Sequence, residues 1–139
     1  MIRPATADDW TAIERLLITS ALPLDGARTH LSSFVVAEHE GMIAGCAALE
    51  RYGKSGLLRS VAVDASRRGS GLGERLVRQI LNTARAEGIE SVVLLTTTAS
   101  EWFPRFGFQR AAEAPASVKA SAEFLGACPE TAVLMSLDL

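Results

Sequence analysis

The sequence predicts a single-domain α/β protein of the α+β kind, with a central, mixed but mostly antiparallel sheet and helices on both faces. The first observation is a strand, a glycine-rich loop, a helix and a second strand in succession over residues 57–98, because such a crossover places two strands parallel. The second is a pair of segments with apolar residues at helical spacing. The third is Glu40-Gly41, a two-residue turn between strand-like segments that predicts an antiparallel hairpin. At 139 residues, we expect one domain, 1–139.

The first part of the chain predicts a short strand, a helix and a hairpin. Residues 2–5 are strand-like, and Thr6 with Asp9 three positions later is typical of a capping box at a helix start. Apolar residues then recur at helical spacing as far as Ala21, and Pro23–Gly26 breaks the pattern. The next expected elements are a helical turn over 28–33, strands over 34–39 and 42–49, and a polar turn over 51–56.

The second part predicts the crossover and the end of the sheet. We expect a buried strand over 57–64, a helix over 74–87 that Gly88 ends, and a second buried strand over 91–98. A short amphipathic helix over 100–106 should follow. The last expected elements are a strand over 108–111, an irregular stretch over 113–130 and a strand over 131–137.

Composition restricts the class of partner. Hydrophobic residues make up 48% and charged residues 22%, as in soluble globular proteins, and the net charge of −2 gives no electrostatic reason to expect nucleic acid or an acidic membrane surface. The start of the chain does not resemble a signal peptide, and no apolar stretch is long enough to span a membrane. We therefore expect a cytoplasmic protein, and the sequence leaves a homodimer open.

The two cysteines do not have metal-ligand spacing, so we expect no metal site. Cys46 lies in an apolar, strand-like run, which favours a buried, reduced thiol. Cys128 is interpreted as a buried structural residue. His30 and His39 have no partner pattern, and we expect both at the surface.

The loop Arg67–Gly73 is the most informative motif. Its three glycines let a ligand approach the backbone closely, and the helix that follows offers free N–H groups to an anion. Arg67 and Arg68 add donors suited to phosphate oxygens. The pattern predicts a diphosphate site; the alternative is a turn that only joins a strand to a helix.

The spacing of the glycines excludes two common phosphate loops. A dinucleotide loop needs Gly-x-Gly-x-x-Gly, but Leu72 or Glu74 occupies the third glycine position here. A nucleoside-triphosphate loop needs Gly-Lys-Ser/Thr, and no lysine lies between Lys54 and Lys119.

The remaining pattern, Arg68-Gly69-Ser70-Gly71-Leu72-Gly73, resembles the Arg/Gln-x-x-Gly-x-Gly/Ala loop of the GCN5-related N-acetyltransferase (GNAT) superfamily. The expected order of elements is similar to the GNAT fold over the whole chain. Further positions also match the family: Ile2, Arg3, Pro4, Ala5, Thr6 and Asp9 at the start, and Ala99, Phe103, Gly107 and Phe108 near the end.

The resemblance implies an acetyl-CoA-dependent N-acetyltransferase in which the fourth and fifth strands splay apart to admit the pantetheine arm. The residues that it implies for acetyl-CoA binding are the backbone of Val61 and Val63 and the loop residues Arg68, Gly69, Ser70, Gly71, Leu72, Gly73 and Glu74. The backbone N–H near Val61 would stabilise the oxyanion. An amine would attack the thioester directly, with a base to accept its proton.

One position departs from the family. Phe103 lies where many members carry the tyrosine that protonates the leaving thiolate, and phenylalanine has no proton to donate. The only tyrosine, Tyr52, is expected in a distant turn. Thr97, Thr98 or water could serve instead, or the acid is dispensable, because a thiolate with a pKa of about 8.5 leaves readily. Thr96 likewise replaces an asparagine that often contacts CoA.

Longer motifs resemble a subgroup. They are Leu57–Val63, Leu94–Ala99, and Ala120–Phe124 with Cys128-Pro129, and they are similar to the arsenic-resistance N-acetyltransferases and to N-acetylglutamate-synthase-type domains. This resemblance implies that the acceptor is the amino group of a small amino-acid-like molecule, an arsenical among them. A non-catalytic acyl-CoA-binding regulatory module and a protein acetyltransferase are the other hypotheses.

An amino-acid acceptor needs a cation for its carboxylate. Arg59 stands out in an apolar strand, as either a carboxylate clamp or the partner of a nearby acid such as Glu50. Lys119 is a second candidate contact, with a solvated surface lysine as the alternative. Thr97 could bind substrate through its hydroxyl. Glu50 could accept the amine proton through water, with a solvated strand-end acid as the alternative.

Overall fold

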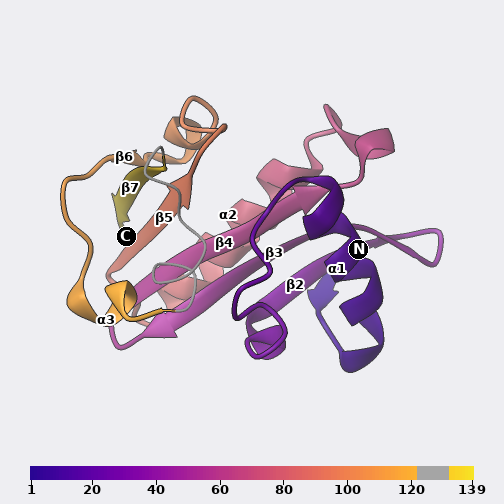
Figure 1. Ribbon diagram of the computed structural model, residues 1–139, viewed down its shortest axis with the longest axis horizontal. Helices are drawn as coiled ribbons and strands as arrows, with labels where there is room; N and C mark the ends of the chain where they lie inside the picture. Colours follow the sequence, from indigo (N-terminus) through magenta and orange to yellow (C-terminus); the bar gives the residue numbers. More distant parts are fainter. Residues whose placement is uncertain (122–131) are drawn as a thin grey trace.

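The computed structural model describes residues 1–121 and 132–139. Within these residues, seven strands form one sheet in the order β1-β2-β3-β4-β5-β7-β6 (Figure 1). The strands are β1 (Ile2–Pro4), β2 (Phe34–His39), β3 (Met42–Tyr52), β4 (Ser55–Val63), β5 (Ser91–Thr96), β6 (Gln109–Arg110) and β7 (Val133–Asp138), and the α-helices are α1 (Trp10–Thr19), α2 (Leu72–Ala86) and α3 (Ala116–Lys119).

The pairing confirms the mixed, mostly antiparallel sheet. Strands β1 to β4 pair antiparallel in sequence order, and β7 pairs antiparallel with both β5 and β6. Only β4 and β5 pair parallel among the described strands, because α2 carries the chain back across the sheet between them.

Helices cover both faces of the sheet, as the sequence predicted. Alternate residues of β3 point to opposite faces, so Cys46 and Ala48 share one core with α1 while Ala47 and Leu49 share the other with α2. The α1 core includes Ile13, Leu16, Leu17, Phe34 and Val36, and the α2 core includes Leu58, Leu76, Val77, Ile80, Leu81 and Ala84. Each helix therefore presses one apolar stripe onto the sheet.

The capping residues predicted at the first helix are present. The Asp9 carboxylate accepts the Thr6 backbone N–H at 2.8 Å and also binds Arg3, which holds the pKa of Asp9 at about 2. A 3₁₀ turn over Ala7–Asp9 precedes α1. Gly88, at φ +85°, follows the end of α2 as predicted.

The predicted polar turn over 51–56 is wrong. Tyr52 pairs with Ser55 and Arg51 with Gly56, so only Gly53 and Lys54 form the turn. Gly53 adopts φ +64°, a left-handed conformation that lets two residues close the hairpin. β3 and β4 are therefore longer than expected, and Tyr52 lies in a strand rather than in a turn.

Several boundaries also differ after the glycine loop. Helix α2 begins at Leu72, two residues early, because Gly71 is its left-handed N-cap. β5 ends at Thr96, whose hydroxyl oxygen accepts the Ala99 N–H at 3.0 Å and turns the chain. The predicted helix over 100–106 is a turn followed by a 3₁₀ helix, Phe103–Phe106, and Gly107 ends it at φ +101°.

The stretch after β6 departs from the expectation as well. The predicted strand over 108–111 is reduced to the two residues of β6, and α3 forms within the stretch expected to be irregular. The last strand begins at Val133. Residues 122–131 lie outside the described residues, and the structural role expected of Cys128 lies there too.

Strands β4 and β5 separate along their length (Figure 1). Their pairing runs from Ser55 with Ser91 to Leu57 with Val93, although β4 continues to Val63. Beyond that point β4 pairs only with β3, while β5 pairs with β7 as far as Thr96. The sheet thus opens into two halves, which is the splay that the family resemblance implied.

Candidate active site

A cavity of about 1080 Å³ occupies the opening between the two halves of the sheet. We call it the main cavity. Its walls come from β4, the glycine loop, the end of β5 and the loop before β2, which are far apart in sequence. The residues that line it include Pro23, Asp25, Arg59, Ser60, Val61, Val63, Arg67, Arg68, Gly69, Gly71, Leu72, Gly73, Glu74, Thr96, Thr97, Thr98, Glu101, Trp102, Phe103 and Arg105.

The glycine loop presents open backbone to the main cavity. Gly69 and Gly71 adopt φ of +83° and +81°, and a Cβ atom at either position would meet nothing within 4 Å. Gly71 caps α2, whose first N–H groups have no partner within the helix. The same end carries the positive pole of the helix dipole. The loop therefore has the geometry of an anion site.

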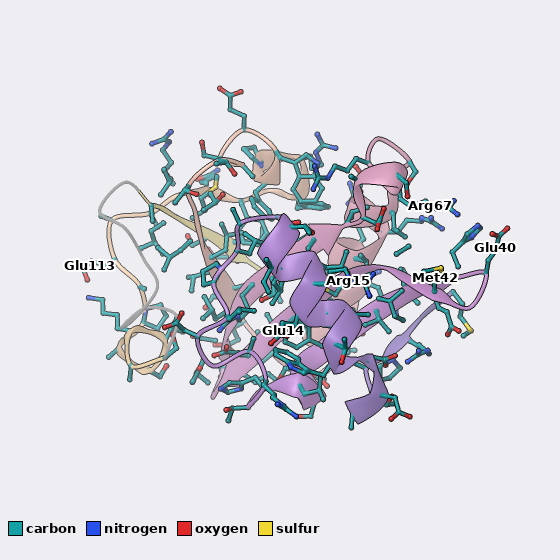
Figure 2. All side chains as sticks on the ribbon, turned by 45° about the vertical axis from the view of Figure 1, so that its right-hand side comes forward. Glu14, Arg15, Glu40, Met42, Arg67 and Glu113 are labelled. Carbon is teal, nitrogen blue, oxygen red and sulfur yellow. The ribbon has the colours of Figure 1, made fainter. Side chains whose placement is uncertain are left out.

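Cationic side chains surround this loop. Arg67 and Arg68 line the main cavity, and Figure 2 shows Arg67 on the segment between β4 and α2. Arg105 lies 5.0 Å from the centre of the Trp102 ring and forms an ion pair with Glu74 at 3.5 Å. The glycine-loop end of the cavity is thus suited to a ligand with several negative charges.

Ser70 has a different orientation from its neighbours in the loop. Its hydroxyl donates to the Arg67 carbonyl at 2.5 Å. Ser70 faces a smaller hollow of about 370 Å³ between the loop, β1 and the β2–β3 hairpin, and Arg67 borders both cavities. The structure therefore brings every predicted loop residue except Ser70 to the main cavity.

A β-bulge in β4 lies at the wall of the main cavity. Ala48 pairs with Arg59 and Cys46 with Ala62, so two residues, Ser60 and Val61, stand opposite the single residue Ala47. Ser60 adopts φ +59°, a left-handed conformation that costs a residue other than glycine about 1–3 kcal/mol. A bulge takes a backbone group out of the ladder. Val61 lies at this point and lines the cavity.

Arg59 forms the buried ion pair that the sequence left as one alternative. Its Nη1 lies 3.0 Å from Glu50 Oε2, and both side chains are almost fully buried. The same guanidinium donates to the backbone carbonyls of Asp25 at 2.6 Å and Pro23 at 3.1 Å. Its Nε donates to the hydroxyl of Ser60 at 3.1 Å. Arg59 thus ties the bulge to the loop before β2.

Glu50 is enclosed by donors rather than by solvent. Besides Arg59, the phenol of Tyr52 donates to its Oε1, and His30 Nε2 lies 3.7 Å from the same oxygen. Burial and this bond to Glu50 raise the pKa of Tyr52 to about 12. Glu50 is not among the residues that line the main cavity. Its role as a base stays a prediction. His30 is half-buried beside this carboxylate.

The other candidates fall in separate places. Thr97 is exposed and lines the main cavity beside Thr98. Lys119 lies outside it and forms an ion pair with Glu113 at 2.6 Å, so its role in binding stays a prediction.

Phe103 is buried in an aromatic cluster with Trp102, Phe106 and Phe108 while bordering the cavity. Cys46 is a buried free thiol, as expected.

Sequence reasoning missed the segment Ser20–Asp25 as part of the site. Its residues, apart from Leu24, line the main cavity. The sequence showed only that the helical pattern stops near Pro23. Nothing in that pattern signals that Arg59, far along the chain, holds two of the carbonyls of this segment.

The described residues contain neither a cluster of metal ligands nor a membrane-spanning helix. No group of three or more histidine, cysteine, aspartate or glutamate side chains is close enough to hold a metal ion in residues 1–121 and 132–139. Over the same residues, every helix is too short or too polar to cross a membrane.

The model of the acetyltransferase (GNAT) domain family matches residues 30–110, and the chain belongs to this family. The match includes β2 to β6 and the glycine loop. Among curated proteins, the chain is 40% identical over 86 residues to an amino-acid acetyltransferase of Neisseria meningitidis, covering 60% of this chain and 20% of that protein. An amino-acid acetyltransferase of Ralstonia nicotianae is 36% identical over 121 residues, covering 79% and 26%. The chain spans about a fifth to a quarter of these relatives.

Solved structures of similar fold agree with membership of the GNAT family. The N-acetylglutamate synthase of Neisseria gonorrhoeae, complexed with coenzyme A and N-acetyl-glutamate, has a TM-score of 0.86 and 30% identity, covering 100% of this chain and 35% of that one. Rv2747 of Mycobacterium tuberculosis, solved in complex with CoA, has a TM-score of 0.85 and 29% identity, covering 100% and 99%. The GNAT fold predicted from the glycine loop is confirmed.

The buried Glu50–Arg59 ion pair should contribute to the stability of the fold, whatever its part in catalysis. Glu50→Gln leaves a buried guanidinium without a counter-charge, so the free energy of unfolding should fall by about 3–5 kcal/mol. Urea denaturation measures this. Glu101→Gln, which removes an exposed acid at the main cavity, should change stability by less than about 0.5 kcal/mol. Unchanged stability of Glu50→Gln would contradict the structural role.

Proposed function

We propose that this domain transfers the acetyl group of acetyl-CoA to the amino group of a small, amino-acid-like acceptor. The observation that carries the proposal is one cavity bounded by an anion-binding glycine loop, two separated strands and the bulge at Val61. The CoA-bound relatives and the names of the curated relatives support it. The reaction takes place in a complex of both substrates, without an acetyl-enzyme.

The donor binds along the side of the cavity that faces α2. The diphosphate takes hydrogen bonds from the backbone of the loop Gly69–Gly73 and from the start of α2, and Arg68 adds a charged donor. The pantetheine arm lies between β4 and β5, where the backbone of Val61 and Val63 forms its hydrogen bonds. Glu74 lies at the same end and orients Arg105.

Direct attack accounts for every atom of the transfer. The neutral amine forms a bond to the thioester carbon, the carbonyl oxygen gains negative charge, and the Val61 N–H stabilises that charge. The C–S bond then breaks and CoA leaves as a thiolate. The amine gives up one proton, to Glu50 through water or to solvent. Phe103 supplies no proton to the thiolate, which is consistent with departure of the thiolate unassisted.

The acceptor binds at the opposite end, between Arg59, Thr97 and the segment Ser20–Asp25. The Arg59 guanidinium is fixed there by its ion pair with Glu50, which also balances its charge. We infer that a small carboxylate-bearing amine is the acceptor class from the names of the relatives. An N-acetylglutamate-synthase-type reaction on an amino acid is favoured by the named relatives, and an arsenical acceptor by the sequence motifs alone.

The glycine loop provides the first test. Gly71→Val should weaken acetyl-CoA binding about tenfold or more in calorimetry, because its side chain extends into open space at the diphosphate site. Gly41→Val is the matched control: Gly41 has a similar φ, +77°, and the same open surroundings, but lies in the β2–β3 hairpin. Figure 2 shows the tip of that hairpin, with Glu40 and Met42, projecting from the body of the protein.

Both variants place a β-branched residue in a left-handed conformation and should lose comparable stability. Only Gly71→Val should lose affinity. Equal affinities in wild type and Gly71→Val, or an equal loss in the two variants, would count against the loop as the diphosphate site.

The acceptor is tested by a panel of amino acids and amino-acid-like arsenicals, with release of the CoA thiol as the measurement. We expect release with at least one α-amino acid and none with the corresponding α-hydroxy acid, because an amine must attack. A preference for an arsenical over every amino acid would select the detoxifying function. Binding of acetyl-CoA without thiol release across the panel would favour the non-catalytic regulatory module instead.

A further inference from the structure

Ser60 is held in a backbone conformation that serine rarely adopts. Its φ of +59° lies in the left-handed region, and the residue is buried in the sheet rather than in a turn. Such a conformation persists only where the surroundings fix it. The contacts of Ser60 therefore show what maintains the bulge.

One of these contacts comes from β3. The thiol of Cys46 donates to the carbonyl oxygen of Ser60, with the sulfur 3.3 Å from the oxygen. Cys46 is fully buried, and burial raises the pKa of its thiol to about 12. The S–H proton is therefore retained throughout the neutral pH range, and the thiol remains a donor.

A second contact comes from within β4. Nε of Arg59 donates to the hydroxyl oxygen of Ser60 at 3.1 Å. The carbonyl and the side chain of Ser60 are thus held from two directions, by groups that are both buried. The next residue along the chain is Val61, at the wall of the main cavity.

We propose that Cys46 is a positioning residue for acetyl transfer: its thiol fixes the Ser60 carbonyl, and thereby the left-handed bulge that directs the Val61 N–H toward the thioester. This proposal rests on the proposed function, because Val61 is its oxyanion donor. Without the thiol contact, Ser60 relaxes toward extended backbone and the peptide N–H of Val61 turns away. Acetyl-CoA binding at the glycine loop does not depend on Cys46.

A double-mutant cycle separates this role from packing of the core. In Cys46→Ala, kcat should fall about tenfold while the KM for acetyl-CoA stays within about twofold. In the Ser60→Gly background, Cys46→Ala should lower kcat less than about twofold, because glycine adopts a positive φ without strain. Cys46→Ser, which keeps a donor, should retain most of the wild-type kcat.

Val36→Ala is the packing control, since Val36 lies in the same core as Cys46. It should lower the melting temperature and leave kcat unchanged at temperatures where the variant is folded. Unchanged kcat in Cys46→Ala, or the same loss with serine and with glycine at position 60, would overturn the proposal and assign Cys46 to packing alone.

A second measurement does not depend on turnover. The ¹⁵N–¹H resonance of Val61 should shift in Cys46→Ala and move less in the Ser60→Gly background, with or without acetyl-CoA. A Val61 resonance unaffected by Cys46→Ala would overturn the positioning role even if no acceptor is found. Absence of turnover in the wild type with every acceptor counts against the proposed function instead, so the two failures are distinguishable.

Discussion

The hydrogen-bond ladder between β4 and β5 stops after Leu57 and Val93, and the rest of the site depends on that interruption. A parallel pair that continued to Val63 would fill the space that the main cavity occupies. The separation persists because each strand has another neighbour: β3 pairs with β4 and β7 with β5. The start of helix α2 lies at this opening. The glycine loop before it therefore lies at one end of the β4 backbone that is not paired with β5. The main cavity, and with it the proposed donor site, therefore depends on one topological feature.

A buried polar network ties the segment before β2 to the bulge at this opening. Arg59 contacts Glu50, two carbonyls of the segment before β2, and Ser60 of the bulge. A buried ion pair is weak evidence for stability in itself, since desolvation offsets much of the attraction. Its value here is geometric, because one planar guanidinium fixes the segment before β2 and the bulge relative to each other.

Local sequence signals predicted most of the fold and the glycine loop that lines the main cavity. The glycine loop, the hairpin glycine and the apolar periodicity each act over a few residues, and the chain order then restricts the topology. The missed features depend on long-range contacts. The bulge at Ser60 arises from register between β3 and β4, and the Tyr52–Glu50 bond required a turn shorter than its polar composition suggested. The wall formed by Ser20–Asp25 is held by Arg59, and no local pattern encodes that contact.

A crystal structure with acetyl-CoA would test directly whether the opening between β4 and β5 is the donor site. We expect the diphosphate on the backbone of Gly69–Gly73 and the pantetheine arm between Leu58–Val63 and Leu94–Thr96. The thioester oxygen should lie about 2.7–3.1 Å from the Val61 nitrogen. Acetyl-CoA bound instead in the smaller hollow beside Ser70, or a thioester oxygen remote from Val61, would contradict it.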